Sequence, residues 1–135
     1  MKTSFSSRRG GVRAKALIEF RNLTKRRVST AEFKKLYKKI FPGKFELSVV
    51  FAPPVLMRKL NRQYRGKNKT ANVLSFLIEK NRGEIFLNIN LLAQAGEKNL
   101  PYLFLHGMLH LKGYDHKKTK DAKKMEKLEK KILKK

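Results

Sequence analysis

The chain has 135 residues, 41% of them apolar, which is enough for one domain with a hydrophobic core. Cysteine is absent, which excludes disulfides, thiolate metal sites and cysteine nucleophiles, and no apolar run reaches the about 18 residues of a membrane span. Lysine and arginine number 34 against 10 acidic residues, a net charge of +24 that favours nucleic acid as the partner and gives no reason to expect a membrane.

The first 15 residues differ in composition from the rest of the chain. They include five basic residues and no acidic residue, with Gly10 and Gly11 in the middle. Because they contain no apolar stretch, they do not form a secretory signal, and we expect a flexible basic arm. An organelle transit peptide has a similar composition and stays open as an alternative to a cytoplasmic protein. Residues 16–135 are then predicted to form a single domain.

The first predicted elements are a strand over residues 16–22 and a helix that follows Ser29 and Thr30, either of which offers an N-cap. Pro42 and Gly43 end this helix. Residues 45–51 alternate between apolar and other side chains, as in a strand. The predicted helix has four apolar residues at helical spacing: Phe33, Leu36, Tyr37 and Ile40.

A second helix is predicted to start at Pro53 and Pro54, and a basic loop, residues 65–69, follows it. Residues 73–78 are predicted to form a buried strand and residues 84–89 another, with a turn over residues 81–83 between them. The apolar stripe of the second helix is formed by Leu56, Leu60 and Tyr64.

A third helix is predicted from Asn99, which can cap it, to Gly113, which ends it. A lysine-rich helix capped by Thr119 or Asp121 is predicted to end the chain. Strands and helices do not alternate regularly, so the pattern indicates an α+β domain in which helices pack on a mixed sheet of about four strands.

All three histidines lie between positions 106 and 116. His106 and His110 are spaced i and i+4, so on a helix they share one face and can bind a single ion. Gly113 permits the chain to turn back and present His116 as a third ligand. Three protein ligands leave a fourth position open for water, as in a catalytic zinc site. The sequence therefore predicts one zinc ion per chain.

The spacing of these histidines is also that of the metzincin peptidases. In those enzymes a glutamate directly follows the first histidine and acts as the general base. Here that position is Gly107. A peptidase of this kind is therefore disfavoured.

The segment HGMLHLKGYDH, residues 106–116, resembles the signature of the YbeY family of bacterial metal-dependent endoribonucleases. Further similarity lies in order along the chain, in residues 60–67, 73–76 and 83–85. The resemblance covers about residues 17–133. It implies an α+β fold with a four-stranded mixed sheet, with a metal helix like that of the zincins, and zinc bound by His106, His110 and His116.

The resemblance also implies a function for the chain. The expected activity is cleavage of single-stranded RNA in ribosomal RNA maturation and ribosome quality control, with ribosomal RNA precursors and a ribosomal subunit or ribosomal proteins as partners. Arg65 matches an arginine that the family needs for activity, and we expect it to hold the phosphate. The alternative is a non-catalytic ribosome assembly factor that binds ribosomal RNA and whose zinc stabilises the fold.

The chain departs from the family at several positions. Thr70, Ala71 and Asn72 stand where the family has Pro-Thr-Asp, so an amide replaces a carboxylate near the site. Glu84 replaces the family's aspartate, and Tyr102 stands where a further histidine is frequent. The identity of a general base is therefore left open.

Several side chains have two interpretations. Glu84 is either a general base or part of a surface ion pair. Ser75 binds phosphate or only satisfies its own hydroxyl, and Asp115 orients an imidazole or caps the last helix. Few aromatic residues lie in the basic segments, which predicts contact with the RNA backbone and little base stacking. The predicted RNA-binding residues are Arg65, Lys67, Lys69, Lys117 and Lys118.

Overall fold

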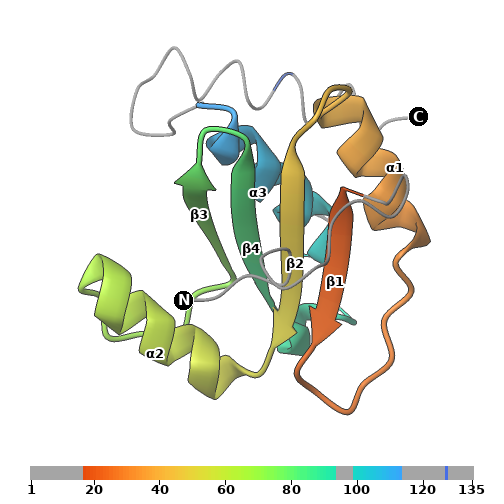
Figure 1. Ribbon diagram of the computed structural model, residues 1–135. Coiled ribbons are helices and arrows are strands. Elements are labelled where there is room, and N and C mark those ends of the chain that lie inside the picture. The colour runs from red at the N-terminus through yellow and green to blue at the C-terminus, as the bar shows by residue number, and fades with distance from the viewer. Residues whose placement is uncertain (1–16, 94–98, 114–126, 128–135) are drawn as a thin grey trace, which may run out of the picture.

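The computed structural model describes residues 17–93, 99–113 and 127 (Figure 1). The basic arm and the lysine-rich C-terminal helix predicted above lie outside these residues, and the single-domain assignment stays a prediction. The elements follow one another as β1 (Ile18–Asn22), α1 (Ala31–Ile40), β2 (Glu46–Ala52), α2 (Pro54–Arg65), β3 (Val73–Glu79), β4 (Arg82–Asn88), the 3-10 turn η2 (Ile89–Leu91) and α3 (Leu100–Leu111).

The strands form one four-stranded sheet in the order β1-β2-β4-β3. Strands β1 and β2 pair in parallel, as do β2 and β4, whereas β3 pairs with β4 in antiparallel orientation. The predicted α+β fold with a mixed four-stranded sheet is confirmed. Strand β3 lies at one edge of this sheet.

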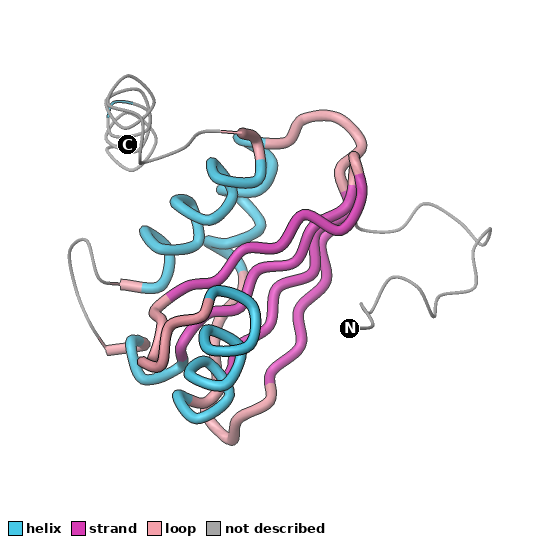
Figure 2. The backbone as a smooth tube through the Cα atoms, turned by 90° about the vertical axis from the view of Figure 1, so that its left-hand side faces the viewer, coloured by secondary structure: helices cyan, strands magenta, loops and turns pink. Residues whose placement is uncertain are grey.

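Helices cover both faces of the sheet (Figure 2). Helices α1 and α3 pack on one face, in a core that includes Val49 and Ile85. Helix α2 covers part of the other face, where Val50 and Phe86 are buried. Because neighbouring residues of a strand point to opposite faces, each residue of β4 can be assigned to the α3 side or to the α2 side.

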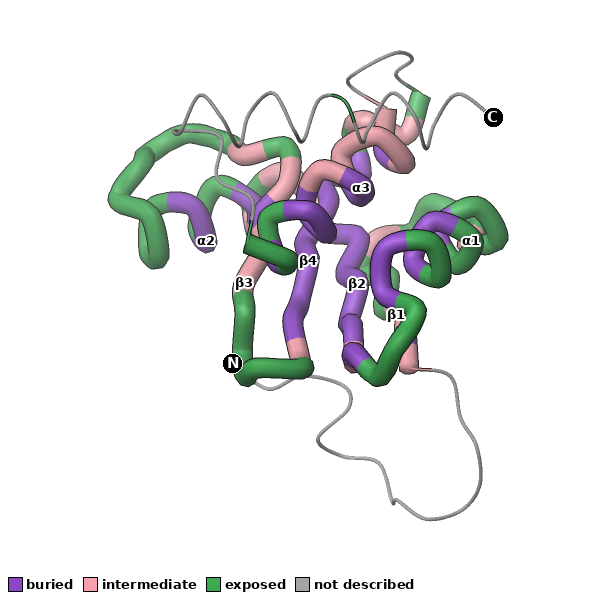
Figure 3. Tube along the Cα trace, turned by 90° about the horizontal axis from the view of Figure 1, so that it is seen from above, coloured by how far each residue is buried: buried purple, intermediate pink, exposed green. Residues whose placement is uncertain are grey.

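Two details of the predicted strands are wrong. Strand β3 is not buried along its length: Leu74 is buried, but Leu77 is 58% exposed, because an edge strand is covered less completely (Figure 3). The predicted turn over residues 81–83 is shorter, since β4 already begins at Arg82 and only residues 80–81 connect the two strands.

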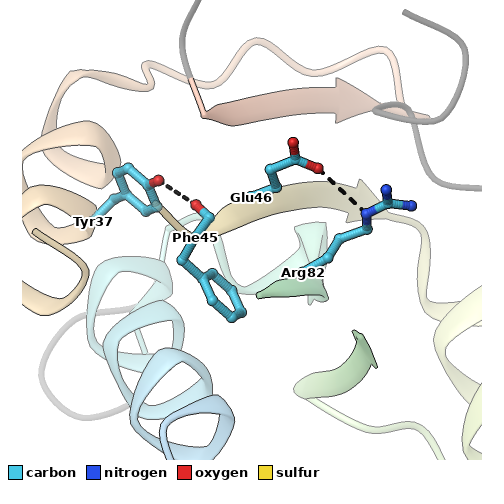
Figure 4. A network of polar contacts seen from close by, with 4 residues as sticks. All are labelled: Tyr37, Phe45, Glu46 and Arg82. Atoms are coloured by element: carbon cyan, nitrogen blue, oxygen red, sulfur yellow. Dashed lines mark hydrogen bonds and ion pairs between the residues drawn. The ribbon is translucent and has the colours of Figure 1, made fainter. Parts of the chain in front are cut away.

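The start of β2 is fixed by two polar contacts (Figure 4). The Tyr37 hydroxyl of α1 donates a hydrogen bond to the carbonyl oxygen of Phe45. Burial, and secondarily the nearby charge of Glu46, raises the pKa of Tyr37, so this hydroxyl stays protonated. Glu46 also forms an ion pair with Arg82 at the start of β4, with 3.3 Å between its Oε1 and the arginine Nε. The contacts align α1, β2 and β4.

The predicted helix boundaries are largely confirmed. Thr30 occupies the N-cap of α1, although its side chain makes no capping hydrogen bond. Asn99 caps α3, and its Oδ1 accepts a hydrogen bond from the Tyr102 amide at 2.9 Å. Gly113 follows α3 with a φ of 108°, a conformation that favours glycine. In the described ranges, every helix is too short or too polar to cross a bilayer.

Candidate active site

His106 and His110 lie on one face of α3, as the spacing predicts. Their ring centroids are 4.9 Å apart, with an angle of 67° between the ring planes. Two imidazoles bound to one tetrahedral zinc ion would have centroids roughly 5 Å apart, given zinc–nitrogen distances of about 2.0–2.1 Å. His106 is partly buried and His110 is exposed. The pair therefore fits two ligands of one ion that stays open to solvent.

The third predicted ligand, His116, lies outside the described residues, as does Asp115. Within residues 17–93 and 99–113, no three metal-binding side chains come together. The Gly113 amide donates a hydrogen bond to the His110 carbonyl at 2.9 Å, which ends α3 directly after the pair. The zinc site as a whole stays a prediction, and its described half agrees with it.

Gly107 explains how closely α3 approaches the sheet. A Cβ atom at this position would lie 2.8 Å from the Ser75 Oγ and 3.3 Å from atoms of Ile85 and Val73. The Ser75 hydroxyl donates a hydrogen bond to the Gly107 carbonyl at 3.2 Å. This contact supports the interpretation that Ser75 only satisfies its own hydroxyl, and not phosphate binding. No larger residue fits here without a shift, so the glutamate of a metzincin peptidase has no room.

A first cleft of about 640 Å³ opens along the edge of the sheet beside the two histidines. It lies between the C-terminal end of α2, the edge strand β3 and the histidine face of α3. Its lining combines the two imidazoles and one guanidinium with aromatic and aliphatic side chains. The lining residues include Tyr64, Arg65, Ser75, Phe76, Leu77, His106 and His110.

A second cleft of about 500 Å³ shares Arg65, Val73 and His106 with the first. The basic loop after α2 lines it with Lys67 and Lys69. Arg65 and both lysines are exposed. The structure thus brings three of the five predicted RNA-binding residues close to His106; Lys117 and Lys118 lie outside the described residues.

The basic loop is attached to α2 by side-chain hydrogen bonds. Asn61 is 2% exposed, and its Nδ2 donates to the Lys69 carbonyl at 2.8 Å. The Arg58 Nε donates to the Asn68 Oδ1 at 3.1 Å. Gly66 ends the helix in a left-handed conformation with a φ of 68°. The cations are therefore presented by an anchored turn.

Glu84 cannot act on a substrate in these clefts. It follows Gly83 and precedes Ile85, both of which face α3, so its side chain points to the opposite face of the sheet. It is 1% exposed, and its Oε2 accepts a hydrogen bond from the Ser48 hydroxyl at 3.3 Å. Burial raises its pKa, although Ser48 and Arg21 act against this. Both interpretations of Glu84, as general base and as surface ion pair, are wrong.

Sequence reasoning missed the aromatic side of the site. Tyr64 was predicted to face the core as part of the α2 stripe, yet it is 50% exposed and lines the first cleft. The reason is that α2 extends beyond the edge of the sheet. Tyr102 and Asn72, both noted only as departures from a family pattern, line the second cleft. The one sequence feature that could have placed Tyr64 at the site is its position directly before Arg65.

The fold and these clefts define an α+β protein with a histidine pair on a helix that packs against a mixed sheet. The model of the family described as Endoribonuclease YbeY matches residues 15–135. The chain belongs to this family. The membership supports an RNA-cleaving role and confirms the resemblance that the histidine segment carries.

Individual relatives agree with this assignment. The chain is 34% identical to the Endoribonuclease YbeY of Phytoplasma mali over 124 residues, which cover 82% of this chain and 84% of the relative. It is 39% identical to that of Ehrlichia ruminantium (strain Welgevonden), over 70% of this chain and 68% of the relative. The solution structure of TM1509 from Thermotoga maritima superimposes with a TM-score of 0.54 at 25% identity, over 85% of this chain and 88% of that one.

Proposed function

We propose that the protein is a zinc-dependent endoribonuclease that cleaves single-stranded RNA, with ribosomal RNA precursors as its substrate. The observation that carries the proposal is that Arg65 and His106 line both clefts, so a cationic and a metal-binding side chain border the same space. Family membership supports the RNA-cleaving activity. Ribosomal RNA maturation, ribosomal partners and the cytoplasm are expectations from the family resemblance.

The donor set supports zinc as the ion. Thiolate ligands are excluded because the chain lacks cysteine, and the histidines offer imidazole nitrogen, which zinc accepts. His106 and His110 would hold the ion from α3, and His116 would complete the site from the segment that follows Gly113. When bound there, zinc supplies Lewis-acid catalysis for cleavage of a phosphodiester.

The charge of the clefts supports a phosphate-containing substrate. Among the described residues, Arg65, Lys67 and Lys69 line the clefts and no acidic residue does. Arg65 has a planar guanidinium that can hold two oxygens of one phosphate and offset charge that develops on it. Clefts of this size fit single nucleotides of an extended strand. We therefore assign phosphate binding to Arg65.

The residue that accepts the proton of the nucleophile is not a carboxylate of the described cleft lining. Asn72 lines the second cleft but its amide is not a base. The attacking group is either water or the 2′-hydroxyl of the RNA. The two routes leave different product ends: a 5′-phosphate after attack by water with departure of the 3′-oxygen, and a cyclic 2′,3′-phosphate after attack by the 2′-hydroxyl. End-group analysis distinguishes them.

The experiment that tests the proposal compares cleavage of a labelled single-stranded RNA by the wild type and by His110→Ala. Lys112→Ala is the matched control, because Lys112 lies two residues further along and lines neither cleft in the described part. All three proteins are purified side by side to detect contaminating ribonuclease. Zinc content and circular dichroism are measured on each sample.

We expect His110→Ala to stay folded, since His110 is exposed while α3 packs through its apolar residues. It should lose zinc and cleave at least about 100-fold more slowly, because metal ligands act as a unit. Lys112→Ala should cleave like the wild type. Equal cleavage by all three proteins would indicate contamination. Unfolding of His110→Ala, with no cleavage by the wild type, would support the assembly-factor alternative.

A further inference from the structure

Tyr64 is an aromatic side chain held in place on one side and accessible on the other. It is 50% exposed at the C-terminal end of α2. Its ring contacts Phe76 of β3 edge-on, with 5.3 Å between the ring centroids and 66° between the planes. Phe76 in turn contacts the buried Phe86 of β4, at 5.8 Å and 81°. This aromatic chain connects Tyr64 to the core, so the exposed ring is positioned by packing.

The position of Tyr64 relative to the histidines is specific. Tyr64 lines the first cleft together with His106 and His110, and Arg65 follows it directly. If Arg65 holds a phosphate, the bases of the two adjoining nucleotides are each separated from that phosphate by a single ribose. The first cleft is lined by the aromatic residues Tyr64 and Phe76, and Tyr64 is the exposed one of the two. The second cleft is lined by Tyr102, which is only partly exposed, together with the cations of the basic loop.

We propose that Tyr64 binds a nucleobase of the RNA by stacking, next to the phosphate held by Arg65. The inference rests on the proposed function and specifies how the substrate is bound. It replaces the sequence-based expectation of backbone contact alone. Stacking on an aromatic ring is tolerant of sequence because every base has a π face. Tyr64 would therefore position the strand without selecting one base.

The test measures binding of a short 2′-O-methyl RNA in which 2-aminopurine, a fluorescent base quenched by stacking, is placed at successive positions. The zinc-loaded wild type, Tyr64→Phe and Tyr64→Leu are compared. Val55→Ala is the control, because Val55 is 79% exposed on the same helix, about 13 Å along its axis from Tyr64, and lines neither cleft in the described residues.

We expect one position of the RNA to be quenched on binding to the wild type and to Tyr64→Phe. Tyr64→Leu should lose this quenching and bind about 5- to 150-fold more weakly, the range for loss of one stacked base. Val55→Ala should bind like the wild type. Unchanged affinity and quenching in a folded Tyr64→Leu variant would overturn the inference, while RNA cleavage by the wild type would still support the proposed function.

A second measurement decides the question if Tyr64→Leu does not fold. The wild type is titrated with RNA that lacks the base at the quenched position. The affinity should fall by a similar factor, and an equal affinity for the abasic and complete RNA would overturn the inference. Failure of the wild type to bind any single-stranded RNA would count against the proposed function itself.

Discussion

Helix α3 and the C-terminal end of α2 border the same cleft but are built in opposite ways. Seven of the twelve residues of α3 are buried, and the helix sits so close to the sheet that a methyl group at Gly107 would displace the Ser75 side chain. At the end of α2, Tyr64 and Arg65 are exposed, and the loop that follows is exposed as well. One border is fixed by packing, and the other is accessible and cationic.

This difference corresponds to two requirements of the proposed reaction. A bound metal ion needs ligands at fixed distances, which a packed helix provides. A polyanionic strand needs exposed cations that can exchange counterions for phosphates. Substitutions at the end of α2 should therefore reduce binding or rate without loss of stability, whereas substitutions on the packed side of α3 should reduce stability first.

Apart from the metal ligands, the largest effect is expected for Arg65→Ala. We expect kcat/KM for RNA cleavage to fall about 100-fold, because a group that stabilises charge on the reacting phosphate typically contributes this much. The melting temperature should stay within about 2 °C of the wild type, since Arg65 is exposed and exposed side chains contribute little to stability. Steady-state kinetics and thermal unfolding check both parts.

Arg62→Ala is the matched control for this prediction. Arg62 is an exposed arginine on the same helix, and it lines neither cleft in the part of the chain that the structure describes. Arg65→Lys should recover only part of the rate, because an ammonium group lacks the planar pair of donors. Equal losses for Arg62→Ala and Arg65→Ala would mean that only the overall charge matters.

The next largest effect is expected for Gly107→Ala, and it is an effect on the stability of the fold. The added Cβ would lie 2.8 Å from the Ser75 Oγ and would disturb its hydrogen bond to Gly107. We expect the free energy of unfolding to fall by about 1–2 kcal/mol, because overpacking costs more than the gain in helix propensity returns. Urea denaturation measures the change.

Gly43→Ala is the comparison for Gly107→Ala. No atom lies within 4 Å of a Cβ at position 43 in the structure, so its stability should stay near the wild-type value. If both alanine variants were equally stable, α3 would not be packed against β3 at Gly107, and the contrast between the two borders of the cleft would fail.

A smaller effect is expected when Lys67 and Lys69 are both changed to alanine. We expect the dependence of log affinity on log salt to become shallower by about 1.4, since each phosphate contact to a single strand contributes about 0.7. Affinity at low salt should fall roughly tenfold with little change in kcat. Titrations at several salt concentrations measure the slope.

The control for the lysine pair removes the same charge elsewhere. Lys34 and Lys35 are exposed on α1, which packs against α3 and contributes no residue to either cleft in the described ranges. Changing both to alanine should leave the slope nearly unchanged. The same reduction in both double variants would show that diffuse charge, and not the basic loop, binds the RNA.

The sequence predicted most of the fold, and the position of His106 and His110 on one face of α3, for a local reason. The i, i+4 spacing of His106 and His110 fixes their distance wherever the helix forms, and apolar periodicity located the helices and strands. It could not predict that Tyr64 and Phe76 line one cleft with the histidines, because this depends on the pairing of β3 with β4 and on the end of α2 that extends beyond the sheet (Figure 1).

The predicted roles of Glu84 were wrong for a related reason. The alternation along a strand shows that two neighbouring residues face opposite sides, but it does not show which side carries the active site. The face that Glu84 occupies follows from its neighbours Gly83 and Ile85, which lie beneath α3. A carboxylate in a strongly basic sequence is expected at the surface, but the structure buries that of Glu84 beside Ser48.

The smallest effect is expected for Glu84→Gln, and it separates a structural carboxyl from a catalytic one. Burial raises the pKa of Glu84 in the folded protein above its ordinary value of 4.5. Between these two pKa values the folded state binds more protons than the unfolded state, so the stability of the wild type falls as the pH rises through this window. A glutamine has no charge to bury and does not undergo this loss.

We therefore expect Glu84→Gln to be slightly more stable than the wild type at pH 7, and the difference to shrink as the pH falls below the ordinary glutamate pKa of 4.5. Denaturant unfolding at several pH values measures it, with Glu79→Gln, an exposed position of β3, as the control variant. RNA cleavage should be unaffected, because Glu84 faces away from the clefts. A large loss of cleavage in a stable Glu84→Gln variant would mean that the two faces of the sheet are coupled, so that the face with Glu84 also contributes to the active site.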